Sequence, residues 1–371
     1  MHVVIVGGGV IGLSTAWRAL ERGLEVTVVD PAPGSEASHA SAGMLPPANE
    51  LILEQEDLLR LCLSSRERYP AFVAGLEAVS GRSVGFRRDG VLDVAFDQDG
   101  LAALEEVRKL EESLGIAIER LDPGECLAHE PALAPTVTGG LLAPDDGAID
   151  PREMTPALLA AIDAHGGLLL RERAIEVIME GDRAAGVRLA GGASVRGDKI
   201  VLAAGCWTHG IGGLPPGVVP EIRPVKGQIL RLRSAEPYLR RTTRAVAGGS
   251  AVYLVPRSNG ELVVGATYEE RGYDTTVTAG GVCELLDKAR KALPGVGALE
   301  LAEAGVGLRP AAPDDLPVLG ATAVPGLLLV TGHSRIGVQL TPVTADLMAG
   351  LLADDLVAGL AEPFAPTRFA G

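Results

Sequence analysis

The sequence predicts an α/β (α+β) fold with two domains. One is built on a parallel sheet and is discontinuous in sequence; the other is built on a mixed β-sheet. The chain opens with a strand, a glycine-rich turn, a helix and a second strand, which is typical of a Rossmann-like nucleotide-binding domain. Strand-rich segments then separate further β–α units, so we expect the second domain to interrupt the first. A length of 371 residues suits two domains.

The first thirty residues make the opening unit. Residues 2–6 (HVVIV) form a short β-branched run typical of a buried strand, and residues 13–23 have helical spacing that ends at Gly23. Residues 25–30 (EVTVVD) predict a second strand that ends in an acid. The small, polar residues 31–43 that follow predict a loop.

The remaining elements follow from apolar periodicity. A helix is expected at 97–114, where Leu101, Leu104, Val107 and Leu110 lie on one stripe. Further helices are expected at residues 51–79 (interrupted near Pro70), 151–165, 278–293 and 342–360, with strands at 87–96, 139–150 (a strand and turn), 167–170, 174–180, 186–189 and 199–203, three between 225 and 267, and two between 316 and 330. This order predicts a first domain of residues 1–85, 144–218 and 305–371, and a second domain of residues 86–143 and 219–304.

Charge and cysteine usage exclude several classes of protein. The net charge is −15, from 48 acidic and 33 basic residues. Nucleic acids and anionic membranes bind basic faces, so neither is an expected partner. Four widely spaced cysteines form no CxxC pair, and no metal-ligand spacing is visible. No signal peptide is evident at the first strand, so we expect a cytoplasmic protein with reduced thiols.

The glycine-rich turn has the context that a dinucleotide site requires. Gly7 permits the tight turn, Gly9 lets the backbone approach a pyrophosphate, and Gly12 lets helix and strand pack closely. The phosphates would then face the N-terminus of the helix that begins near Val10. Asp30 ends the second strand and would accept hydrogen bonds from ribose hydroxyls, which disfavours NADP.

Three later segments favour FAD over NAD. The small-residue segment 38–45 (SHASAGML) could lie along a flat ring, and the strand in 198–207 (DKIVLAAGCW) ends in small residues suited to passing beneath a nucleotide. The segment 331–342 (TGHSRIGVQLTP) is a glycine-punctuated turn that opens the last helix. A helix N-terminus aimed at the flavin would stabilise the negative charge that develops on reduction.

Taken together, these motifs resemble the D-amino-acid-oxidase-like FAD amine oxidases, and most of all the bacterial glycine oxidases linked to thiamine-thiazole synthesis. The segments YLVPRSNGELVVGAT, GVGLRPAAPDDLPVLG and TGHSRIGVQLTP occur in the order that the family shows, and the likeness runs from about Val3 to Leu352. The resemblance implies an FAD domain built from three stretches of chain, a substrate domain with a large mixed sheet, and a homotetramer.

The resemblance also implies which residues bind the cofactor. Besides the three glycines, it places Val10, Ile11, Asp30 and Pro31 at the ADP end, Ser38, His39, Gly43, Met44 and Leu45 beside the ribityl chain and ring, Ile175 at the adenine, and His333, Ser334, Arg335, Ile336, Gly337, Val338 and Gln339 around the pyrimidine edge. We expect FAD to be held non-covalently, because the sole cysteine in a nucleotide motif, Cys206, should lie near the ADP half.

The resemblance implies that Tyr253, Arg309 and Arg335 bind substrate. Arginine is the planar, bidentate donor for a carboxylate, and a tyrosine hydroxyl can add one hydrogen bond. Both arginines are expected in loops. Two departures bear on substrate preference: Ala251 stands where the family has histidine, and Tyr268 stands in the pocket where the family has methionine.

We therefore expect FAD-dependent oxidative deamination of glycine, sarcosine or D-alanine to the 2-oxo acid, with dioxygen as acceptor and hydrogen peroxide as product. No nucleophile dyad is visible, which fits hydride transfer to a flavin. Two alternatives stay open: a D-amino-acid or sarcosine dehydrogenase that passes electrons to a quinone or protein, and a non-catalytic dinucleotide-binding subunit.

Overall fold

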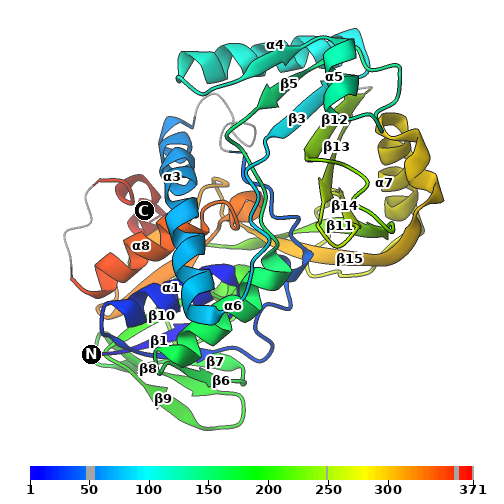
Figure 1. Cartoon of the computed structure of the whole chain (residues 1–371). Coiled ribbons are helices and arrows are strands. Elements are labelled where there is room, and N and C mark those ends of the chain that lie inside the picture. The colour runs from blue at the N-terminus through cyan, green and yellow to red at the C-terminus, as the bar shows by residue number, and fades with distance from the viewer. Residues whose placement is uncertain (47–54, 248–249, 355–358, 370–371) are drawn as a thin grey trace.

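The computed structural model describes residues 1–46, 55–247, 250–354 and 359–369. Three sheets organise the chain into two lobes (Figure 1). A six-stranded and a three-stranded sheet lie in the lobe that holds the N-terminus, and an eight-stranded sheet forms the other. The predicted α/β class with a mixed sheet is thereby confirmed.

The six-stranded sheet carries the opening unit. Its strand order is β16 (Val318–Ala321), β17 (Leu327–Thr331), β10 (Lys199–Leu202), β1 (His2–Val6), β2 (Glu25–Val29), β6 (Leu168–Leu170). All neighbours are parallel except β16 and β17. The small antiparallel sheet consists of β7 (Ala174–Glu180), β8 (Arg183–Leu189) and β9 (Ser194–Arg196).

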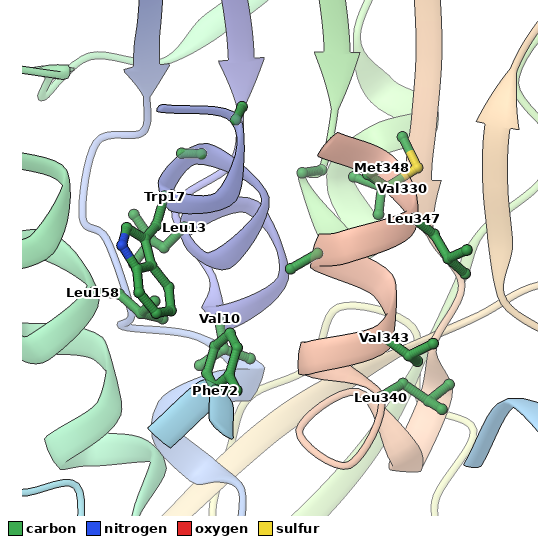
Figure 2. Close-up of a cluster of buried hydrophobic side chains, with 14 of the residues drawn as sticks. Val10, Leu13, Trp17, Phe72, Leu158, Val330, Leu340, Val343, Leu347 and Met348 are labelled. Atoms are coloured by element: carbon green, nitrogen blue, oxygen red, sulfur yellow. The ribbon is translucent and has the colours of Figure 1, made fainter. Parts of the chain in front are cut away.

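Four helices pack around the large sheet of this lobe and bury its core. They are α1 (Val10–Glu21), α3 (Glu56–Ser80), α6 (Pro151–Ala164) and α8 (Thr341–Leu352). Trp17 of α1, Phe72 of α3 and Leu158 of α6 belong to one buried hydrophobic cluster (Figure 2). Helix α8 contributes Val343 and Met348 to the same cluster. Trp17 and Phe72 meet edge to face with ring centroids 5.1 Å apart. This packing fixes the helix that follows the glycine turn.

The eight-stranded sheet is mixed. Its order is β15 (Glu300–Ala311), β11 (Arg223–Arg233), β14 (Glu261–Gly265), β13 (Ser250–Pro256), β12 (Thr242–Ala247), β3 (Val91–Ala95), β5 (Gly139–Ala143), β4 (Glu119–Leu121). Only β12 and β3 pair in parallel. Helix α7 (Ala279–Ala292) covers one face, and α4 (Gln98–Ser113) packs on β3 and β5. The short α5 (Pro123–His129) adjoins β4 and β5.

Most predicted elements are found within a few residues of their expected bounds, with exceptions. Helix α3 runs through Pro70 without interruption, although an interior proline loses its N–H donor and crowds the carbonyl four residues earlier. Residues 51–54 and 355–358 of two predicted helices lie outside the described ranges. Helix α5, the short helix α2 (Ala37–Ala40) and strands β4, β9, β12 and β15 were not predicted, and helix α8 ends at Leu352 rather than at residue 360. The predicted domain boundaries remain a prediction.

Across the described ranges, every helix is too short or too polar to traverse a lipid bilayer. All four cysteines, which lie within those ranges, are free thiols.

Candidate functional site

A cavity of about 1220 Å³ lies between the two large sheets. The carboxyl ends of β1, β2 and β10 line one end, and one face of the eight-stranded sheet lines the other. The predicted residues that line it are Gly7, Gly9, Val10, Ile11, Asp30, Pro31, Ser38, Gly43, Met44, Ile175, Tyr253, Tyr268, Arg309, His333, Ser334, Arg335, Gly337, Val338 and Gln339. Gly12, His39, Leu45 and Ile336 do not line it. The volume exceeds that of an ordinary small-ligand pocket, which is about 300–1,000 Å³.

The glycine turn is shaped by close backbone approaches. Gly7 has φ +119°, and a Cβ there would lie 2.3 Å from the carbonyl oxygen of Ala203. A Cβ on Gly12 would lie 2.1 Å from the oxygen of Gly7. Gly12 thus acts in packing between turn and helix, which is why it does not line the cavity. The end of β10 passes directly beneath the turn, as the small residues after that strand predict.

Asp30 and Ser38 close the nucleotide end of the cavity. The Asp30 carboxylate accepts hydrogen bonds from the backbone N–H groups of Gly8 (2.7 Å) and Ala32 (2.8 Å). The backbone N–H of Val10 donates to the Ser38 hydroxyl at 3.0 Å. These contacts hold the acid and the helix N-terminus at the same end of the cavity, where a ribose and a pyrophosphate could both be bound.

The small-residue segment 31–43 includes a short helix, α2 (Ala37–Ala40), that packs on β15. A Cβ on Gly307 would lie 2.6 Å from the Cβ of Ala40. Helix α2 and strand β15 can therefore approach this closely only because β15 has a glycine at that position. Arg257 is buried and donates to the carbonyl of Ala42 at 2.6 Å. The backbone of this segment is therefore fixed along the cavity wall.

The segment 333–339 forms the facing wall. It contains a 3-10 turn at Ser334–Ile336, and helix α3 holds it from behind: the Tyr69 hydroxyl donates to the carbonyl of Val338, and the Ser65 hydroxyl donates to that of Gln339 at 2.6 Å. The Gln339 side-chain Nε2 is buried and has no hydrogen-bond partner within the protein. A buried donor without a partner at a cavity wall is satisfied when a polar ligand binds beside it.

His333 is neutral in this wall. Burial lowers its pKa to about 3, and its ring Nε2 lies 3.2 Å from the Thr344 hydroxyl. The histidine thus supplies a hydrogen bond within the wall and no charge at neutral pH.

Tyr253 and Arg309, two of the predicted substrate-binding residues, lie on the face of the eight-stranded sheet that lines the cavity. The Tyr253 ring of β13 lies over Gly265, where a Cβ would meet it at 2.4 Å. The Arg309 guanidinium lies over Gly227 in the same way, with Nη2 2.4 Å from a Cβ built there. Arg309 Nη1 also donates to the carbonyl of Thr267 at 3.2 Å. Glycines on the intervening strands thus let both side chains lie flat against the sheet.

Arg309 lies in strand β15, so the predicted loop is wrong at this position. The segment AEAGVGLRPA is rich in glycine and alanine, which disfavour strands in isolation. It pairs with β11 along its length, and that tertiary pairing decides its structure. Arg335 lies in the 3-10 turn and is exposed, and Tyr268 is 59% exposed on the loop after β14.

The structure adds cavity-lining residues that sequence reasoning missed. They are chiefly Glu36, Asp93, Arg173, Gly227, Arg244, Gly265 and Thr267. Gly265 and Thr267 fall in the GAT motif, so that motif could have indicated them. Asp93, Gly227 and Arg244 lie on strands that pair with distant segments, so no local pattern signals them. Glu36 and Arg173 lie outside the strands and helices, and Glu36 falls within the small-residue segment 31–43.

A family model described as FAD dependent oxidoreductase (DAO) matches residues 2–351. The chain belongs to this family of FAD-dependent oxidoreductases.

Several proteins similar to this chain have named activities. A glycine oxidase of Geobacillus kaustophilus is 32% identical over 100% of this chain and 97% of its own length. The crystal structure of glycine oxidase from that species matches with a TM-score of 0.92, at 31% identity, covering 99% of this chain and 98% of the other. A bifunctional ThiO/ThiG protein of Synechocystis is 34% identical over 99% of this chain. The chain spans about half of that relative's length, 54%.

The residues present fit FAD, which is the cofactor of the family. Gly7, Gly8 and Gly9 line the cavity without side chains, so the backbone before helix α1 is open to a pyrophosphate. Asp30 lies at the end of β2, where an acid would bind a ribose, and Gln339 offers a buried donor that has no partner within the protein. The cavity is continuous from this end to Tyr253 and Arg309.

Proposed function

We propose that this protein catalyses the oxidative deamination of glycine and related small amines such as sarcosine and D-alanine. Glycine, dioxygen and water would give glyoxylate, ammonia and hydrogen peroxide; sarcosine would release methylamine in place of ammonia. The observation that carries the proposal is the single cavity that joins the dinucleotide turn to Arg309 and Tyr253. The relatives named glycine oxidase support the choice of substrate.

Arg309 would bind the substrate carboxylate. Its guanidinium is half-buried, and the carbonyls of Thr267 (3.2 Å) and Lys226 (3.4 Å) accept from its Nη1 and fix its plane against the sheet. Tyr253, also half-buried, would donate its hydroxyl to the same carboxylate. Arg335 on the opposite wall would add a second positive charge at the exposed side.

Positioning is the main task of these residues. Bound FAD supplies a two-electron acceptor for the hydride on the substrate α-carbon. Holding the carboxylate at Arg309 fixes the orientation of that carbon, and such orientation contributes up to about 7–11 kcal/mol in favourable cases. Ile229, Gly265 and Gly307 line the same face without charge, so they limit the water that competes near the reacting carbon.

Further properties are part of the same proposal. FAD would be held non-covalently: Cys206 lines the cavity near the glycine turn, and burial raises the pKa of its thiol to about 12, which disfavours a reactive thiolate. We also propose a cytoplasmic homotetramer, with the domain division given above and a role in supplying thiamine-thiazole synthesis, which the ThiO/ThiG relatives support.

The test is a peroxide assay on the yellow holoprotein with glycine, sarcosine and D-alanine in air. We expect stoichiometric peroxide and, from glycine, glyoxylate. Turnover with an artificial dye but not with dioxygen would favour a dehydrogenase instead. No turnover with either acceptor, with FAD bound, would contradict the proposed reaction.

A further inference from the structure

Arg257 is a buried arginine that belongs to the eight-stranded sheet but reaches segments that lead into the other lobe. It follows strand β13 directly and is 5% exposed. It does not line the cavity, so it has no direct part in the cofactor site or in the proposed carboxylate site. A charged side chain is costly to bury unless its donors are used, so the groups that Arg257 binds indicate its role.

The Arg257 guanidinium joins two segments that lie far apart in the sequence. Its Nη1 donates to the carbonyl of Ile149 at 2.9 Å, and its Nη2 donates to the carbonyl of Ala42 at 2.6 Å. Its Nε lies 3.4 Å from a carboxylate oxygen of Asp150, which balances the charge. Because the nitrogens of a guanidinium form a rigid, planar fork, Arg257 fixes the two carbonyls relative to each other.

These two segments form a short antiparallel ladder. Met44 and Ala148 are its bridged pair. The backbone hydrogen bonds on either side of that pair are Ile149 N–H to Gly43 C=O (2.8 Å) and Leu45 N–H to Gly147 C=O (2.9 Å). Arg257 therefore holds one carbonyl in each strand of the ladder, beside the bonds that close it.

The ladder determines where the backbone of Met44 points. In a bridged pair of this kind, the N–H and C=O groups of the two bridged residues point away from each other, toward the outer edges of the ladder. On the outer edge of Ala148 they pair with the backbone of Arg87, at 2.8 and 3.0 Å. On the opposite edge, the Met44 N–H has no acceptor among the described residues, and Met44 lines the cavity. A backbone donor without a partner on a cavity wall is open to a ligand.

Met44 lies at the end of the cavity where the substrate is proposed to bind. Met44 and Tyr253 pack against the same small hydrophobic cluster, which includes Ala42, Ala148 and Ile229. The part of FAD that accepts electrons from the substrate has to lie at this end, and the nitrogens and carbonyls of its ring are hydrogen-bond acceptors. A hydrogen bond to the ring is stronger in the reduced form, which carries more negative charge.

We propose that Arg257 is a positioning residue for the cofactor: by holding the carbonyls of Ala42 and Ile149, it aims the Met44 N–H at an acceptor atom of the flavin ring and so stabilises the reduced ring. This role requires that FAD binds in the cavity, and it does not depend on which amine is oxidised.

The experiment measures the midpoint potential and the FAD dissociation constant of the Arg257→Lys holoprotein. Lysine keeps a positive charge beside Asp150, but its single nitrogen cannot replace two donors set apart in a plane. We expect the equilibrium constant for flavin reduction to fall about ten-fold, which is about 30 mV for two electrons, and FAD to bind several-fold more weakly. The paired variant Asp150→Asn/Arg257→Gln, which leaves no unpaired buried charge, should show the same losses.

Arg368→Lys is the matched control. Arg368 also donates to backbone carbonyls, among them those of Phe364 (2.6 Å) and Leu316 (3.1 Å), but none of its acceptors lines the cavity. We expect this variant to keep the wild-type midpoint potential and FAD affinity. Loss of FAD from the folded Arg257 variants, but not from the control, would also support the proposal.

A wild-type midpoint potential in either folded Arg257 variant would overturn the proposal, and so would an equal shift in Arg368→Lys. If neither Arg257 variant folds, hydrogen exchange at the Met44 amide of the wild-type protein decides the matter. Slower exchange with FAD bound than without it supports the proposal, and equal exchange overturns it. None of these measurements involves turnover, so a failure of the proposed amine oxidation would be seen separately, in the peroxide assay.

Discussion

Arg309 is the residue on which the proposed substrate binding depends. Its guanidinium lies flat over Gly227 and is fixed by the carbonyls of Thr267 and Lys226. The sequence could identify it because it lies in a family motif and because arginine suits a carboxylate. Arg244 and Asp93 could not be identified in that way, since their pairing joins residues 151 positions apart.

Replacing Arg309 should weaken substrate binding and leave the cofactor in place. For Arg309→Ala we expect the KM for glycine to rise by roughly ten-fold to 150-fold, the equivalent of about 1.5–3 kcal/mol for hydrogen bonds to a charged group. Steady-state kinetics, with the FAD content read from absorbance, measures this. Arg188→Ala, at an exposed position, should change neither value. An unchanged KM would contradict the proposal that Arg309 binds the substrate carboxylate.

The glycine beneath Arg309 should matter as much as the arginine. In Gly227→Ala the new Cβ would lie 2.4 Å from the Arg309 Nη2 atom, so the guanidinium must move and KM should rise at least several-fold. Gly305→Ala is the matched control on the paired strand, because its Cβ would meet Ile229 and Glu303 at ordinary contact distances of 3.5 Å or more. Equal KM values in the two variants would show that the close approach has no role.

At the level of helices and strands, tertiary contacts determine the structure of the segments for which the sequence-based prediction was wrong. Strand β15 was expected as a loop around Arg309, since glycine and alanine disfavour strands, yet pairing with β11 and contact with α2 hold it extended. Helix α3 continues through Pro70 because its buried face, which includes Phe72 and Tyr69, packs on α6 and α8. Elements with strong local sequence patterns, such as the opening β–α–β unit, were predicted close to their observed bounds.

Helix α3 should stabilise bound FAD through the wall segment 333–339. In Tyr69→Phe the carbonyl of Val338 loses the hydroxyl donor and keeps only the backbone N–H of Thr341 at 3.1 Å, at a cost of about 0.5–1.5 kcal/mol for one hydrogen bond. We expect faster FAD release on dilution, measured by flavin fluorescence. Tyr238→Phe, at a tyrosine that does not line the cavity, should release FAD at the wild-type rate. Unchanged release from Tyr69→Phe would argue against this support.

Across the whole molecule, two lobes with separate cores meet at one cavity. The α/β class with a mixed sheet could be predicted from the sequence, because a glycine turn and strand-rich runs leave clear patterns. The far end of the cavity could not, because it is assembled from β3, β12 and α4, which lie far apart along the chain.

The free energy of unfolding should depend on pH through the buried carboxyl of Glu111. Burial raises the pKa of this carboxyl from 4.5 to about 8, so between those values the folded protein holds a proton that the unfolded chain releases. The free energy of unfolding should therefore fall as pH rises from about 5 to about 8, by up to about 1.4 kcal/mol per pH unit from this group. In Glu111→Gln that loss should shrink, as chemical denaturation at the two pH values would measure. The exposed neighbour variant Glu112→Gln should keep the wild-type slope, and an unaltered slope in Glu111→Gln would exclude a buried protonated carboxyl.

The account as a whole requires FAD and a substrate carboxylate in the same cavity. A crystal structure of the holoprotein with glycolate, an unreactive analogue of glycine in which a hydroxyl replaces the amine, tests this most directly. We predict the glycolate carboxylate within hydrogen-bond distance of the Arg309 guanidinium and the Tyr253 hydroxyl, with the flavin ring between segment 333–339 and β15. Glycolate bound away from Arg309, or a flavin ring outside this cavity, would contradict the account.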